Sequence, residues 1–244
     1  MKKHVPNMLT LLNLASGTVA IVLSLEGQWR LAVYLVLAAS LFDFLDGTAA
    51  RLLNAYSKTG KILDSLADMV TFGVLPGIFV YALFREQFMV QPSGGAFDWI
   101  PLQWIILASV VVIPMFSAIR LARFTEASTG GDRFLGLPTP AHTLFWTGLY
   151  WQIMRDGLMF GNPVNLFFLW AIMFIMAFHM ILPVPMLSLK FRHFGFRENL
   201  FRYLVLGSAA LILIFTGLPG LSLVVLTYIL LSLLNLLATL RVSK

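Results

Sequence analysis

The chain contains no cysteine among its 244 residues. Disulfides, thiolate metal sites and a cysteine nucleophile are therefore excluded. Charged side chains are also scarce, because Asp, Glu, Lys and Arg make up 11% of the sequence, whereas soluble domains average roughly 25%. Hydrophobic residues make up 59%, and the mean hydropathy is +0.86. This balance predicts an integral membrane protein.

Eight apolar runs are long enough, or nearly long enough, to cross a bilayer as helices, for which about 20 residues are needed. They cover residues 8–25, 30–53, 61–83, 102–124, 138–155, 163–183, 199–217 and 220–240. The connections are short and leave no segment for a soluble domain. We therefore expect one membrane-embedded domain over residues 1–244, an all-α polytopic membrane protein built as a bundle of about eight transmembrane helices. The first run lacks a small-residue cleavage site, so no cleavable signal peptide is expected.

The basic residues are distributed unevenly along this predicted bundle. Of the 17 Lys and Arg residues, 14 fall on the side that holds both termini, and only Arg30, Arg85 and Arg155 fall on the other. Because Lys and Arg favour cytoplasmic loops, both termini and the loop between the second and third runs are predicted to be cytoplasmic. The net charge of +6 is explained by this topology and by anionic headgroups, so no nucleic-acid partner is expected.

Four of the 11 acidic residues lie within positions 43–68, and these are Asp43, Asp46, Asp64 and Asp68. An ionisable side chain at the bilayer centre costs about 2.5–3.5 kcal/mol on insertion scales, so four uncompensated carboxylates at that depth would oppose insertion by about 10 kcal/mol. Bound divalent cations are the best explanation of such a cluster.

Helical spacing places these carboxylates on two faces that can meet. On the second run, one face is shared by Asp43, Asp46, Gly47, Ala50 and Arg51. On the third run, which we expect to begin near Lys61 after a turn at 54–60, one face is shared by Gly60, Asp64 and Asp68. Neighbouring antiparallel helices would bring the faces together at the cytoplasmic membrane boundary.

Carboxylate oxygens suit Mg²⁺ or Mn²⁺, and four carboxylates are enough to hold two ions about 4 Å apart. Gly47 and Ala50 leave room against the helix for a bulky group, and Arg51 supplies a cation suited to phosphate. The residues therefore predict a pocket for a metal-bound diphosphate that carries a base or a sugar.

The pattern D-x2-D-G-x2-A-R-x8-G-x3-D-x3-D over residues 43–68 resembles the signature of the CDP-alcohol phosphatidyltransferase family at every defined position. The resemblance implies transfer of a phosphatidyl-type group from a CDP-linked lipid to an alcohol, with release of CMP. It implies that the four Asp residues hold two divalent metals and that Asp68 is the candidate base. The donor nucleotide would then be bound by Asp46, Gly47, Ala50, Arg51, Gly60 and Thr10. Asn7, Thr10 and Asn13 near the N-terminus could reach the nucleotide or a polar headgroup, but helix capping and packing explain these three equally well.

Four further segments, residues 6–14, 63–73, 120–124 and 134–141, resemble the bacterial and archaeal phosphatidylserine synthases within that family. This implies CDP-diacylglycerol and L-serine as substrates and a prokaryotic cytoplasmic (inner) membrane. Arg120 and Arg123 are expected to face one way, one binding the serine carboxylate and the other a phosphate. Positive-inside anchoring is the alternative for both. Thr125 stands where these relatives typically have Asn.

Other functions remain open at this point. Within the family, the acceptor could be glycerol 3-phosphate, inositol phosphate or choline. From other classes, a divalent-cation transporter would also carry acidic residues in its spans, but all four carboxylates here lie on one side of the bilayer. A non-catalytic lipid-binding protein would not need the paired Asp arrangement. Small residues at 15–17 and 207–210 predict close packing within the chain, with a homodimer seam as the alternative.

Overall fold

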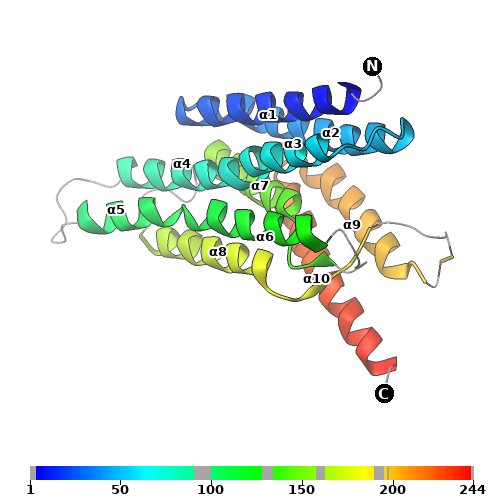
Figure 1. Ribbon diagram of the computed structural model, residues 1–244. Helices are drawn as coiled ribbons and strands as arrows, with labels where there is room; N and C mark the ends of the chain where they lie inside the picture. Colours follow the sequence, from blue (N-terminus) through cyan, green and yellow to red (C-terminus); the bar gives the residue numbers. More distant parts are fainter. Residues whose placement is uncertain are drawn as a thin grey trace.

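The computed structural model describes residues 4–90, 100–127, 134–157, 163–189, 195, 196 and 198–242. These form a helical bundle with one two-stranded antiparallel pair (Figure 1). The elements in chain order are α1 (His4–Leu25), α2 (Trp29–Leu52), α3 (Lys58–Asp68), the π-helix η1 (Met69–Val74), α4 (Leu75–Val90), α5 (Ile100–Ser109), α6 (Val112–Ala127), β1 (Phe134–Leu135), α7 (Thr139–Asp156), α8 (Pro163–Ile181), β2 (Pro185–Met186), α9 (Leu200–Thr216) and α10 (Gly220–Val242).

Among the residues that the structure describes, six helices are long and apolar enough to cross a membrane, in agreement with the expectation of a polytopic helical membrane protein. They cover His4–Leu25, Trp29–Leu52, Lys58–Phe88, Gln103–Thr125, Val164–Ile181 and Gly220–Thr239. The other two expected runs correspond to α7 and α9. Helix α7 is less apolar because it carries the buried polar residues Thr139, His142, Thr143 and Thr147, and α9 has only 17 residues. The count of eight spans therefore stays a prediction.

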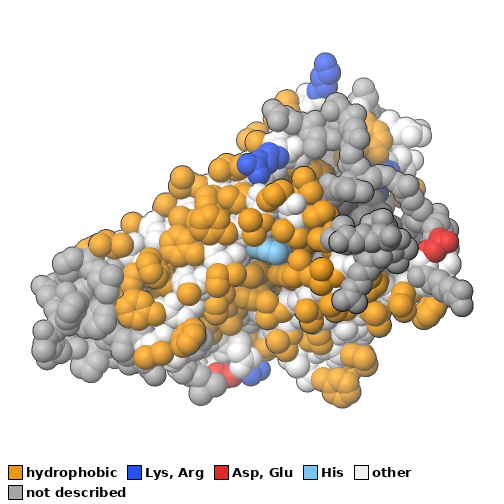
Figure 2. Space-filling view, turned by 90° about the horizontal axis from the view of Figure 1, so that it is seen from below, with side chains coloured by type: hydrophobic (Ala, Val, Ile, Leu, Met, Phe, Trp, Pro, Cys, Tyr) orange, Lys and Arg blue, Asp and Glu red, His pale blue; other side chains and the backbone are white. Residues whose placement is uncertain are grey.

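The outer surface matches a lipid environment. Figure 2 shows hydrophobic side chains spread over much of one face, with few charged side chains, which lie near its edges. Large apolar side chains that are more than half exposed include Phe44, Trp104, Phe168 and Phe215. Since water would oppose this exposure and hydrocarbon would not, the surface is that of a membrane protein.

Helix α7 forms the centre of the bundle. Helices α1 and α2 lie side by side with α3 and α4 next to them, and α5, α6 and α8 pack on the opposite side (Figure 1). Helix α10 packs against both α7 and α9. The ring of Tyr150 on α7 stacks on that of Phe79 on α4 with centroids 4.3 Å apart, and its hydroxyl lies 3.0 Å from Ser24 Oγ on α1. Residues from α1, α4 and α7 thus share one core.

The π-helix η1 lies between the acidic helix α3 and Pro76. Proline has no N–H to give to the carbonyl four residues earlier, and its ring clashes with that carbonyl in a regular helix. Here that carbonyl is Phe72 O, and it accepts a hydrogen bond from Thr143 Oγ1 of α7 at 3.1 Å. This hydrogen bond therefore connects η1, and with it the span that carries Asp64 and Asp68, to the central helix α7.

Close packing of α1 fixes the same span from the other side. A Cβ placed on Gly17 would lie 2.2 Å from Thr71 Oγ1, so only glycine permits this approach. The Thr71 hydroxyl in turn donates to the Asn13 carbonyl at 3.3 Å. The small-residue cluster at 15–17 therefore packs within the chain at Gly17. For Gly207, an added Cβ meets nothing within 4 Å in the described part of the chain.

Candidate active site

Three of the four predicted carboxylates come together. Asp43 on α2 and Asp64 and Asp68 on α3 each offer an oxygen, and these atoms all lie within 4.8 Å of one another. All three side chains are half-buried. Helix α3 begins at Lys58, earlier than expected, because the Ser57 side chain caps it by accepting from Gly60 N. The carboxylates of α2 and α3 thus form the cluster that the helical spacing predicted, and α1 packs against both helices.

In the described part of the chain, no Lys or Arg side chain forms an ion pair with this cluster. Among the residues that the structure describes, the ion pairs are Arg85–Glu86 and Arg155–Asp156, and neither involves the four carboxylates. Close, half-buried carboxylates repel one another unless a cation lies between them. Oxygen donors at this spacing fit a hard divalent cation such as Mg²⁺ or Mn²⁺. The residues present therefore fit the metal that the sequence implies.

The fourth carboxylate, Asp46, is held by α1. It is buried, and its Oδ2 atom accepts a 2.6 Å hydrogen bond from Thr10 Oγ1, which is also buried. Its charge acts on both Asp43 and Asp64, so it belongs to the same electrostatic cluster. Thr10 was predicted to bind the donor nucleotide, and in the structure its hydroxyl orients a predicted metal ligand.

A second contact from α1 reaches Asp68. Asn13 is fully buried, and its Nδ2 atom lies 3.5 Å from Asp68 Oδ1. From the sequence, helix capping and packing explained Asn13 as well as nucleotide binding did. One feature of the sequence could have indicated that Asn13 faces the site. Small and polar residues recur along one face of α1, and the structure buries them: Thr10, Asn13, Gly17, Ala20 and Ser24. Polar members at helical spacing on such a stripe face the rest of the bundle.

The predicted donor-binding residues lie beside the cluster. An added Cβ on Gly47 meets nothing within 4 Å among the described residues, so the α2 surface is open there. Arg51 is exposed and its Nε donates to Gly47 O at 3.0 Å, which places its guanidinium over that open surface. Ala50 is half-buried. Gly60 lies at the base of α3, where a Cβ would crowd Ser57 Oγ and Asn7 Oδ1.

The two arginines of α6 have separate environments, contrary to the expectation that they face one way. Arg120 is buried and its Nη1 donates to Thr139 Oγ1 of α7 at 3.2 Å. Arg123 is exposed and its Nη1 donates to Ile181 O at the end of α8. Tertiary contacts cause this difference, because α6 packs against both α7 and α8. The charge of Asp68 acts on the buried Arg120.

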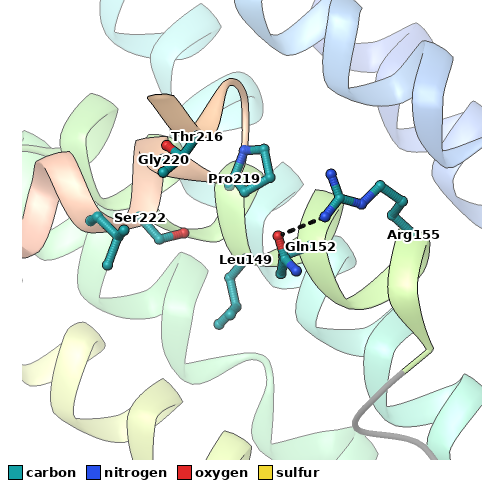
Figure 3. A pocket seen from close by; sticks show the side chains of 9 residues that line it. Leu149, Gln152, Arg155, Thr216, Pro219, Gly220 and Ser222 are labelled. Atoms are coloured by element: carbon teal, nitrogen blue, oxygen red, sulfur yellow. Dashed lines mark hydrogen bonds between the residues drawn. The ribbon is translucent and has the colours of Figure 1, made fainter. Parts of the chain in front are cut away.

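A separate pocket of about 430 Å³ lies at the other end of α7 (Figure 3). It is lined by Gly148, Leu149, Gln152, Arg155, Thr216, Pro219, Gly220, Ser222 and Leu223. Within this lining, Arg155 donates to Gln152 Oε1 of the same helix. No carboxylate belongs to this lining, and at 1.5 Å per residue its centre lies roughly 20 Å along α7 from Thr139. The carboxylate cluster is therefore the candidate active site.

Comparisons with known proteins find relatives of this chain. A CDP-diacylglycerol–serine O-phosphatidyltransferase of Mycobacterium leprae is 34% identical over 151 residues, 59% of this chain and 45% of the relative. An archaetidylserine synthase of Methanothermobacter thermautotrophicus is 33% identical over 172 residues, 65% of each. A CDP-diacylglycerol–serine O-phosphatidyltransferase of Saccharomyces cerevisiae is 32% identical over 173 residues, 67% of this chain and 59% of the relative.

In each of these three alignments the matched region spans about half to two thirds of the relative's length. The family model described as CDP-alcohol phosphatidyltransferase matches residues 3–184, which include the whole carboxylate cluster and both arginines of α6. The chain therefore belongs to the CDP-alcohol phosphatidyltransferase family.

Proposed function

We propose that this protein transfers the phosphatidyl group of CDP-diacylglycerol to the hydroxyl of L-serine, giving phosphatidylserine and CMP. The observation that carries the proposal is the cluster of Asp43, Asp64 and Asp68 within 4.8 Å, beside the open surface at Gly47. The names of the relatives support serine as the acceptor and CDP-diacylglycerol as the donor.

Asp43, Asp46, Asp64 and Asp68 would hold two divalent cations, Mg²⁺ or Mn²⁺. When bound, the cations supply Lewis-acid stabilisation of the charge on the diphosphate and on the departing CMP. Thr10 holds Asp46 in place, and Asn13 does the same for Asp68. The open α2 surface at Gly47 would receive the nucleotide, and Arg51 would neutralise phosphate charge.

Asp68 would act as the general base. It takes the proton of the serine hydroxyl as the hydroxyl oxygen attacks the phosphorus of the phosphatidyl group. The new bond joins serine oxygen to phosphorus, and the phosphoanhydride bond from that phosphorus to CMP breaks. Direct in-line attack needs no covalent intermediate, in agreement with the absence of cysteine.

Arg120 would bind the carboxylate of serine, since it is buried and charge-coupled to Asp68. Arg123, which is exposed at the end of α6, would contact phosphate of the donor. The basic bias at the termini supports an active site at the cytoplasmic face of a prokaryotic inner membrane. Helices α7 and α9 would complete eight spans in one domain, with the lipid tails of the donor in the bilayer.

The test is CMP release from CDP-diacylglycerol by purified protein in detergent with Mg²⁺ or Mn²⁺. Serine, glycerol 3-phosphate, inositol phosphate and choline are offered in parallel. We expect metal-dependent release with serine and identification of phosphatidylserine as the lipid product. Release with another alcohol instead would keep the family and refute serine as the acceptor. Folded protein that releases no CMP with any of the four would contradict the proposed reaction.

A further inference from the structure

His142 lies on α7, one turn after Thr139, and is fully buried. Its Nε2 atom accepts a 3.0 Å hydrogen bond from Trp146 Nε1. Because the indole nitrogen is only a donor, Nε2 carries no proton, and the single proton of the ring is assigned to Nδ1. A second proton, on Nε2, would point at the indole N–H. The ring is therefore neutral and presents Nδ1–H as a donor.

That donor has no hydrogen-bond partner among the residues described here, and neither has the buried Nε of Arg120. The two groups are linked through one helical turn, because Arg120 Nη1 donates to Thr139 Oγ1, three residues before His142. The charge of Arg120 acts on His142, and the charge of Asp68 acts on Arg120. In the described part of the chain, α6 and α7 thus each carry one buried donor without a partner, and Arg120 interacts electrostatically with both His142 and the proposed base.

A buried donor without an acceptor costs about 1–3 kcal/mol, so two of them favour a ligand that supplies acceptors. A carboxylate is acceptor-only and has two oxygens. One cation and one neutral donor match the single charge of a carboxylate better than the charge of close to −2 on a phosphate monoester. The hydroxyls of Thr139 and Tyr228 do not fill this role, because neither His142 Nδ1 nor Arg120 Nε has a hydrogen-bond partner among the described residues.

We propose that Nδ1–H of His142 and the guanidinium of Arg120 together bind the carboxylate of the amino-acid acceptor, which makes His142 a specificity-determining residue. The inference rests on the proposed transfer to serine and deepens it. Trp146 is a positioning residue, because its N–H fixes the tautomer of His142. An alcohol without a carboxylate, such as choline, would leave both donors unpaired, and this is the physical basis for discrimination against it.

The test uses the full-length enzyme in detergent with Mn²⁺, and the apparent KM for serine is measured at saturating CDP-diacylglycerol. In His142→Phe, which keeps a ring but removes the donor, we expect the serine KM to rise about tenfold or more, the equivalent of about 1.4 kcal/mol. The KM for CDP-diacylglycerol is expected to stay within twofold. His142→Asn, whose amide donor replaces Nδ1–H, should recover part of the loss. His179→Phe on α8 is the matched control and should leave the serine KM unchanged.

A folded His142→Phe enzyme with the wild-type serine KM would overturn the inference. If that variant does not fold, Trp146→Phe is measured in its place, and a serine KM equal to that of the wild type would likewise overturn it. Failure of the proposed function is seen separately, because the wild-type enzyme would then make no phosphatidylserine.

Discussion

Replacing Thr10 by Val removes the hydroxyl that holds Asp46 while keeping the shape of the side chain. Both partners are buried, at 3% and 5% exposure, and the bond is 2.6 Å long. A hydrogen bond to a charged group contributes about 1.5–3 kcal/mol. That free energy corresponds to roughly 10- to 150-fold in an equilibrium constant. The same range, about 10- to 100-fold, is typical when the partner of a metal ligand is removed.

We therefore expect Thr10→Val to raise the Mn²⁺ concentration needed for half-maximal CMP release by about 10- to 100-fold. The assay is a Mn²⁺ titration of CMP release at fixed CDP-diacylglycerol and serine. Thr10→Ser keeps the hydroxyl and should remain close to the wild type. Thr18→Val is the matched control on the same helix, because the Thr18 hydroxyl donates only to Leu14 O of its own helix. A Thr10→Val enzyme with the wild-type Mn²⁺ dependence would refute the view that α1 positions a metal ligand.

Three further predictions follow from the packing and the cluster. Gly17→Leu should lower the free energy of unfolding by about 1–3 kcal/mol or prevent folding, because the leucine side chain would overlap Thr71. Thermal unfolding measures this loss, and Gly207→Leu is the control that should leave stability unchanged. Gly47→Leu should unfold like the wild type, but it should raise the KM for CDP-diacylglycerol about tenfold, because the leucine fills the open α2 surface. An unchanged KM would mean that the donor binds elsewhere. EDTA should abolish CMP release and added Mg²⁺ or Mn²⁺ should restore it, and activity that persists in EDTA would exclude a metal requirement.

The carboxylate cluster could be predicted from the sequence because it depends on local geometry. Offsets of three and four residues set which side chains share a helix face, and a short turn makes consecutive helices antiparallel neighbours. These two rules suffice to bring Asp43 next to Asp64 and Asp68, as the structure confirms. The same rules do not say which other helix packs against the pair, so the contribution of α1 through Thr10 and Asn13 needed the tertiary structure.

Tertiary contacts also decided the features that sequence reasoning missed or described wrongly. Arg120 and Arg123 are three residues apart, yet one donates to α7 and the other to α8. In the π-helix η1, Phe72 O accepts a hydrogen bond from Thr143 of α7, a partner 71 residues away. The tautomer of His142 depends on Trp146 and could have been noticed, since residues four apart on a helix are neighbours.

The most direct test of the central claim compares Asp68→Asn with the wild type for phosphatidylserine formation from CDP-diacylglycerol and labelled serine in Mn²⁺. Asp156→Asn is the control, because Asp156 is a carboxylate at the far end of α7, paired with Arg155. Loss of a general base lowers rates by about 10²- to 10⁴-fold, and loss of a metal ligand adds to this. We predict at least that loss in folded Asp68→Asn and wild-type activity in Asp156→Asn. A folded Asp68→Asn enzyme that forms phosphatidylserine at the wild-type rate would contradict the account.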